Sequence, residues 1–215
     1  MHEEIDQKLA DIFDADRKLR AAQEHFLGHG DERGRVEALG RALDAASKAA
    51  EEDLDAQDRL VRVAELLTDH PSASACWLLL RLLDHAEPAV RAAAGEGLLE
   101  IGQTRYADVA RTFEKAIDQG SQHTALMELP FLLAELGDAG GVKLCTRLLK
   151  HPVADVVAAA VEALASLGDP SSVKDLERLK GDRRKVSAED EADGAELTLG
   201  ELVSEALAHL RGLHG

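Results

Sequence analysis

Apolar residues recur at helical spacing along most of the chain, and two stretches repeat one pattern almost residue for residue. Residues 85–102 read HAEPAVRAAAGEGLLEIG, and residues 151–168 read HPVADVVAAAVEALASLG, 66 positions later with no gap needed to align them. Apolar residues three and four positions apart share one face of an α-helix, so each stretch predicts a helix. The separation equals two units of about 33 residues, a period that indicates an array of helical repeats.

A middle copy lies where that period requires it. Residues 121–138, SQHTALMELPFLLAELGD, end on the same Leu-Gly signal, and we expect Pro130 to kink or break their helix. In each copy the glycine that follows the first helix (Gly102, Gly137 or Gly168) suits a left-handed C-cap. A tight turn and a second helix follow, in YADVARTFEKAIDQ, AGGVKLCTRLLKH and PSSVKDLERLKG.

An earlier copy, DRLVRVAELLTDHP followed by SASACWLLLRLLDH, extends the series towards the N-terminus. We therefore expect an all-α array from 57 to 215. Its units span about 57–86, 87–120, 121–151 and 152–182, and a closing helix spans 197–212. Each helix has an apolar stripe with nothing of its own to bury it against, so neighbouring pairs must stack into one continuous core.

The repeats resemble HEAT-like repeats, especially the short kind of the phycobilin lyases. The residues that carry the resemblance are Glu87-Pro88, Val90-Arg91, Ala92 to Ala94, Leu167-Gly168-Asp169-Pro170 and Val173. The resemblance implies a right-handed α-solenoid in which the second helix of each pair faces the concave side. It does not imply one function, because HEAT arrays scaffold, transport, regulate and occasionally catalyse.

Two segments depart from the repeat. Residues 1–56 read as two longer helices around the loop GHGDERG, with apolar stripes at Ile5, Leu9, Ile12, Phe13, Leu19 and Phe26, and at Val36, Leu39, Leu43 and Ala46. We expect this acidic segment to be an N-terminal cap over the open end of the stack. Near the other end, DRRKVSAEDEADGAE is polar and charge-rich, which is typical of a mobile loop.

Composition narrows the classes of partner. The formal net charge is −16 and only 3% of residues are aromatic, so nucleic acid and anionic membranes are poor partners. No apolar run is long enough to span a bilayer, and the acidic N-terminus does not resemble a signal peptide. Cys76 and Cys145 sit among leucines, which indicates buried free thiols in a reducing cytoplasm.

No residue pattern supports catalysis or a cofactor. His70, His85 and His151 fall at helix ends, where capping and the helix dipole favour histidine. His25 and His29 are spaced for one metal but have no third ligand. Deoxyhypusine hydroxylase, a similar array, binds iron through His-Glu pairs. The matching positions here are Ala92-Ala93 and Ala158-Ala159. We therefore expect no enzyme activity, no metal and no cofactor.

Aligned second helices carry a stripe of basic positions. Two rows repeat every 31 to 34 residues, and together they contain Trp77, Arg81, Arg111, Lys115, Lys143, Arg147, Lys174 and Arg178. One interpretation is a concave groove that binds an acidic or phosphorylated segment of a partner protein, with Trp77 as an apolar anchor. The other is that these bases stay solvated or pair with Glu114, Asp118, Asp175 and Glu177.

The sequence thus predicts a non-enzymatic protein-interaction module or scaffold. Two alternatives stay open. One is a chromophore-handling accessory or enzyme of the lyase type, which follows from the resemblance alone. The other is a self-associating scaffold in which the acidic N-terminal segment of one copy docks on the basic groove of the next.

Overall fold

The computed structural model describes residues 2–48, 53–120, 123–186 and 197–214, and these residues are almost entirely helical. The helices are α1 (His2–Gly28), α2 (Glu32–Ala46), α3 (Leu54–Thr68), α4 (Ala73–Leu83), α5 (Pro88–Gln119), α6 (His123–Leu136), α7 (Ala139–Leu148), α8 (Ala154–Leu167), the 3-10 turn η1 (Pro170–Ser172), α9 (Val173–Glu177) and α10 (Leu199–His214). Within the described ranges, the one β-bridge joins Lys185 and Thr198.

Local capping signals set where most of these helices begin. A side-chain oxygen of the residue before the helix accepts a backbone N–H of its first turn, at Asp31 for α2, Asp53 for α3, Ser72 for α4 and Asp138 for α7. Such caps satisfy donors that have no partner within the helix. Pro88 opens α5, where a missing N–H costs nothing.

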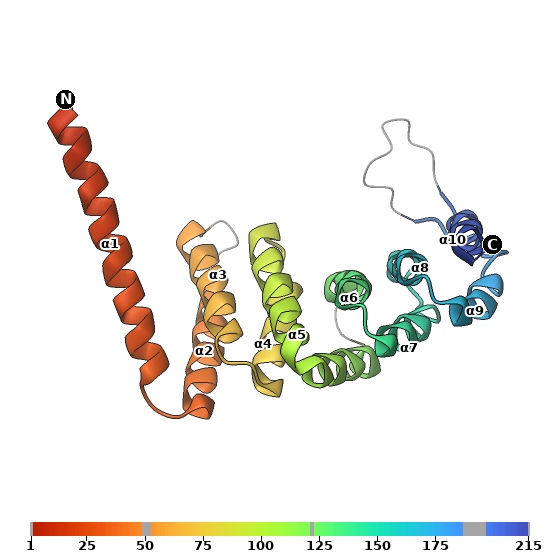
Figure 1. Cartoon of the computed structure of the whole chain (residues 1–215), viewed down its shortest axis with the longest axis horizontal. Coiled ribbons are helices and arrows are strands. Elements are labelled where there is room, and N and C mark those ends of the chain that lie inside the picture. The colour runs from red at the N-terminus through yellow and green to blue at the C-terminus, as the bar shows by residue number, and fades with distance from the viewer. Residues whose placement is uncertain (1, 49–52, 121–122, 187–196, 215) are drawn as a thin grey trace.

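The helices stack in two layers along the long axis of the molecule (Figure 1). One layer contains α3, the first half of α5, α6, α8 and α10, which pack side by side in that order. The other contains α2, α4, the second half of α5, α7 and α9. This confirms the predicted all-α solenoid of helix pairs.

A single apolar core runs through the array from Val36 on α2 to Leu210 on α10. Leu98 and Leu164, which occupy equivalent positions in two units, are both fully buried. Cys76 and Cys145 are buried free thiols, as expected, and burial raises their pKa values to about 11 and about 12. None of the helices in the described ranges combines the length and hydropathy that a membrane span requires.

The expectation that Gly102 ends a helix is wrong, and Pro130 does not break its helix. Gly102 does not end a helix in the left-handed conformation, although Gly137 and Gly168 do, at φ 65° and 67°. The chain continues through Gly102 and kinks at Arg105, where φ is −135° and ψ is 44°. Gly102 instead packs closely against α6, because a Cβ there would lie 2.6 Å from a methyl carbon of Leu136 and that side chain would have to shift. Pro130 lies within α6, which continues past it to Leu136.

The two N-terminal helices lie differently relative to the array. Helix α2 packs against α3 and α4 and contributes Val36, Leu39 and Leu43 to the common core. Helix α1 instead stands away from the array (Figure 1), so it does not cover the open end. The predicted boundary at residue 56 falls in the first turn of α3, which shares that core with α2.

The predicted loop near the C-terminus lies largely outside the described residues, which omit 187–196. Its flanks are joined by backbone hydrogen bonds. Val186 N donates to Leu197 O at 3.0 Å, and Leu199 N donates to Arg184 O at 2.9 Å. These bonds fix the start of α10 against the end of the last repeat.

Candidate interaction site

The eight stripe residues all lie in the layer formed by α4, the second half of α5, α7 and α9. Trp77 and Arg81 are on α4, Arg111 and Lys115 on α5, Lys143 and Arg147 on α7, and Lys174 and Arg178 on or next to α9. Six of them are exposed, whereas Trp77 and Arg147 are half-buried. The repeat register therefore places equivalent positions on neighbouring helices of one layer.

Ion pairs join this stripe from one helix to the previous one. Arg81 Nη2 lies 2.7 Å from Asp44 on α2. Arg147 Nη1 lies 3.2 Å from Glu114 on α5, and its Nη2 pairs with Asp118. Each of these arginines reaches back to an acid on the preceding helix of its layer. All of the partners are solvent-exposed, so each pair contributes little stability, typically below about 1 kcal/mol.

Other stripe residues pair within their own helix or not at all. Arg111 lies 3.5 Å from Asp108, and Arg178 lies 2.5 Å from Asp175. Lys143 and Lys174 are exposed and have no ion pair with any residue that the structure describes. Four of the seven bases are thus balanced by neighbouring acids, which leaves the positive charge of the stripe on its lysines.

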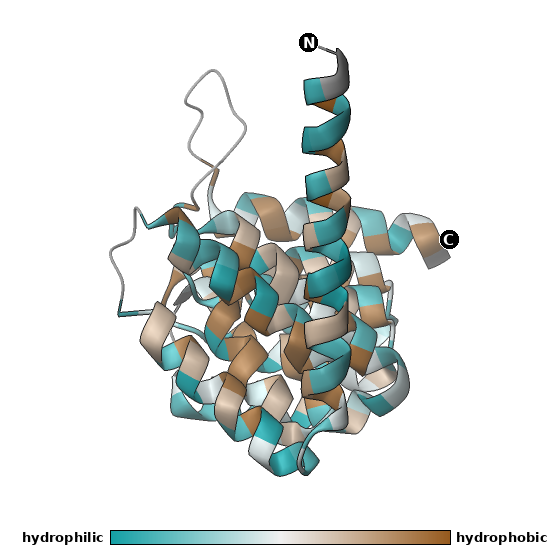
Figure 2. Cartoon of the chain, turned by 90° about the vertical axis from the view of Figure 1, so that its left-hand side faces the viewer, coloured by the Kyte–Doolittle hydropathy of each residue, from teal (hydrophilic) through white to brown (hydrophobic). Residues whose placement is uncertain are grey.

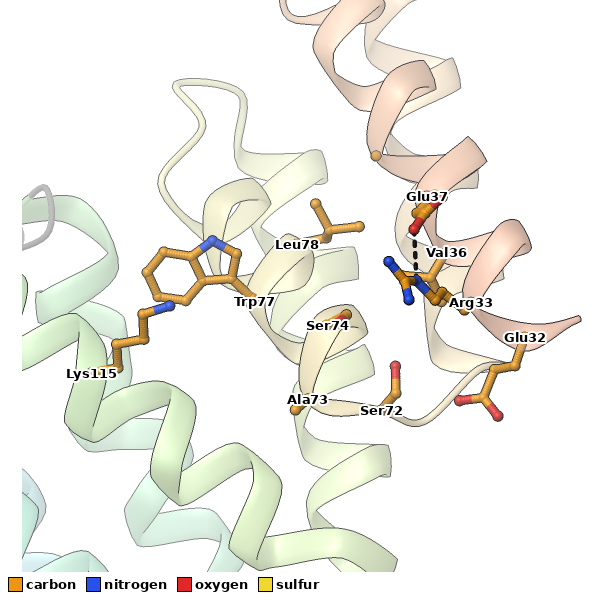
Figure 3. A pocket seen from close by; sticks show the side chains of 11 residues that line it. Glu32, Arg33, Val36, Glu37, Ser72, Ala73, Ser74, Trp77, Leu78 and Lys115 are labelled. Atoms are coloured by element: carbon orange, nitrogen blue, oxygen red, sulfur yellow. Dashed lines mark hydrogen bonds and ion pairs between the residues drawn. The ribbon is translucent and has the colours of Figure 1, made fainter.

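A groove opens at the N-terminal end of this layer, between α2 and α4 (Figure 3). Its volume is about 890 Å³, and Val36, Trp77 and Leu78 give it an apolar lining. Lys115 reaches it from α5 and holds its Nζ 4.3 Å from the centre of the Trp77 ring, a cation–π contact. The structure thus brings together two of the predicted residues at one concave site.

The side of the groove formed by α2 was not predicted from the sequence. Gly40 on α2 faces Leu78 on α4, where an added Cβ would make an ordinary van der Waals contact, 3.6 Å from the methyl carbons. Glu32, Arg33 and Glu37 line the groove as well, and Arg33 Nε donates to Glu37 at 2.9 Å. The apolar stripe of α2 was visible in the sequence, but no signal in it showed which helix it would meet.

Histidines at the helix ends have structural roles. Nδ1 of His85 accepts the backbone N–H of Glu87, and Nδ1 of His151 accepts that of Val153. His70 is buried, and its Nε2 accepts a hydrogen bond from Arg35 Nε at 3.2 Å. Among the described residues, no cluster of three or more His, Cys, Asp or Glu side chains could hold a metal ion.

Comparisons with known proteins identify the repeat. A family model described as HEAT repeats matches residues 118–190, which include α6 to α9. The search of curated proteins found no match. Among solved structures, the chain is similar to a crystal structure of an engineered protein from the Northeast Structural Genomics Consortium. The two chains share 17% sequence identity, and their structures match with a TM-score of 0.37. The match covers 89% of this chain and 96% of the engineered chain. The resemblance to HEAT repeats is confirmed within the matched residues, and HEAT repeats commonly serve as protein-interaction scaffolds.

Proposed function

We propose that the protein is a non-enzymatic scaffold that binds an acidic or phosphorylated segment of a partner protein across the layer of α4, α5, α7 and α9. The observation that carries this proposal is the half-buried Trp77 in the groove between α2 and α4, with the ammonium group of Lys115 above its ring. An aromatic side chain in a concave, partly desolvated site is the usual anchor of a protein interface.

The acidic groups of the partner would bind to the lysines of the stripe rather than to its arginines. Lys115, Lys143 and Lys174 come from three successive units, and none of them has a carboxylate partner among the described residues. Packed helices lie roughly 8–10 Å apart, which corresponds to about three residues of extended chain. A segment with one large apolar residue, followed by acidic groups about three residues apart, would therefore fit this row.

A peptide display selection on the whole protein tests the proposal. Trp77 is the only tryptophan in the sequence, so its fluorescence reports directly on the groove. We expect selected peptides to combine acidic residues with one large apolar residue and to change the Trp77 emission on binding. Changing Lys115, Lys143 and Lys174 together to Glu should weaken their binding at least tenfold, and added salt should weaken binding to the unaltered protein.

The matched control is Arg59→Glu, which reverses an exposed charge on α3 in the other layer. It should leave peptide binding unchanged. Peptides that bind equally well to the triple lysine variant, or that bind without any change in Trp77 emission, would refute the proposed site.

A further inference from the structure

Helix α1 exposes its apolar stripe to solvent. Ile5, Leu9, Ile12, Phe13 and Leu19 are each at least 40% exposed, whereas apolar side chains in the array are mostly buried. Among the residues that the structure describes, the last turn of α1 packs against the core, through the half-buried Phe26. Figure 2 shows α1 extending beyond the array with apolar positions along its free length. A contiguous exposed apolar stripe of this kind marks an interaction surface.

The stripe has the spacing of a coiled coil. Steps of four and three residues alternate along one seam, through Ile5, Leu9, Ile12, Asp16, Leu19, Gln23 and Phe26. This is the 3.5-residue repeat that keeps one face of a helix against a partner helix over several turns. The partner of α1 is therefore expected to be another helix lying along it.

Charge along α1 identifies the orientation of that partner. From Glu4 to Asp16 the helix carries five acids and one base, Lys8. The next turn carries Arg17, Lys18 and Arg20. A parallel second copy would place acid against acid, whereas an antiparallel copy places the acidic half of each helix beside the basic turn of the other.

We propose that two copies of the chain dimerise through an antiparallel pair of α1 helices centred near Asp14. This centre places Leu9 opposite the partner's Leu19 in the seam. The two-fold symmetry repeats the contact, so Leu19 also lies opposite the partner's Leu9. It also places Arg20 beside the partner's Asp6. Phe13 meets its own counterpart at the two-fold axis on one side of the seam, and Ala15 meets its counterpart on the other.

The polar seam residue Asp16 is consistent with this arrangement. It lies 2.7 Å from Arg20 within α1, so its charge is already paired as it enters the seam. Arg20 then lies between Asp16 and the partner's Asp6, and a polar seam position of this kind fixes the register of a coiled coil. A helix of this length is about 40 Å long, so an antiparallel pair keeps the two arrays at opposite ends, where they do not collide.

Sedimentation velocity of the full chain, over a range of concentrations, tests the dimer. We expect dimer at high concentration and a change to monomer in the Phe13→Glu variant, which places two carboxylates at the axis. The matched control is Ala21→Glu, which adds the same charge on the outer face of α1 and should leave the dimer intact. The unfolding transition of the repeat array should be unchanged in both variants, because this part of α1 makes little contact with the array.

A charge exchange tests the orientation. Arg20→Asp should weaken the dimer, and the double change Asp6→Arg with Arg20→Asp should restore it. In a parallel pair these two positions would lie about 21 Å apart along the axis, so no restoration would occur. Ala15→Cys should also give a disulfide-linked dimer on mild oxidation, whereas Ala21→Cys should not. The native thiols Cys76 and Cys145 are buried and should not contribute.

A protein that stays monomeric at every concentration would overturn this proposal. So would a dimer that survives Phe13→Glu but is lost on charge reversal of Lys115, since that result would place the contact at the groove between α2 and α4. The proposal does not depend on the function proposed for that groove, and loss of peptide binding would leave it unaffected.

Discussion

Arg147 on α7 lies 3.2 Å from Glu114 on α5, 33 positions earlier in the chain. The separation is one repeat, so the pair links equivalent helices of successive units. Arg81 on α4 and Asp44 on α2 make the corresponding contact two steps nearer the N-terminus. Arg211 on α10 lies 3.3 Å from Glu177 on α9, and this pair joins the two layers at the C-terminal end. These contacts indicate that some arginines of the basic stripe form ion pairs with acidic residues of the array itself.

We expect the Arg147–Glu114 pair to contribute little to stability. A double-mutant cycle with Arg147→Ala and Glu114→Ala, measured by urea unfolding, should give a coupling energy below about 1 kcal/mol that falls as salt is added. Both side chains are more than one third exposed, which is the reason for the small value. A coupling above about 2 kcal/mol would show that the pair is a structural element of the array.

The repeat register was predictable from the sequence because equivalent positions in stacked units become neighbours. Leu98 and Leu164 both lie in the core, and the eight stripe residues all lie in the layer of α4, the second half of α5, α7 and α9. The position of α1 was not predictable, because an amphipathic pattern shows that a stripe needs a partner without showing which partner. Gly102 illustrates a second limit, since glycine serves equally for a left-handed cap and for close packing against Leu136.

Core truncation should destabilise the array at either of two equivalent positions. Leu98→Ala and Leu164→Ala should each lower the free energy of unfolding by about 2–5 kcal/mol, because both side chains are fully buried and would leave cavities. Leu54→Ala is the matched control, since Leu54 is 71% exposed at the start of α3. Urea unfolding followed by circular dichroism gives these values. If Leu98→Ala lowered the free energy of unfolding no more than the control does, the repeat register that places Leu98 in the core would be wrong.

Gly200 is expected to be the least tolerant glycine of the closing helix. A Cβ at this position would lie 2.5 Å from the backbone oxygen of Lys180 and 3.1 Å from that of Asp182. Backbone cannot move aside as a flexible side chain can, so Gly200→Ala should displace α10 from the last repeat. We expect a lower melting temperature and faster amide hydrogen exchange in α10.

Gly181→Ala is the control for that substitution. Gly181 lies near the same contact but has no atom within 4 Å of an added Cβ. Its replacement should change the melting temperature little. Equal effects of the two substitutions would show that the close approach of α10 to residues 180–182 is not required for stability.

His70 should make the stability of the array depend on pH. Its pKa is lowered from the ordinary value of 6.5, first by burial and then by the positive charge of Arg35, against the opposing charges of Asp69 and Glu32. The unfolded chain therefore binds a proton at a higher pH than the folded chain does. The contribution of His70 to stability is fully present above about pH 6.5 and is lost as the pH falls below that value.

The physical cause is a hydrogen bond that only the neutral ring can accept. Arg35 Nε donates to His70 Nε2, and Nη1 of the same arginine donates to the backbone oxygens of His29 and Gly30 at 3.0 Å and 2.7 Å. Protonation of His70 would place two positive charges together at the junction of α1, α2 and α3. Urea unfolding at pH 7.5, 6.5 and 5.5 should therefore show a loss of stability that is smaller in His70→Gln, whose amide oxygen can accept the same bond without titrating. Identical pH dependence in the two proteins would place the titrating group elsewhere.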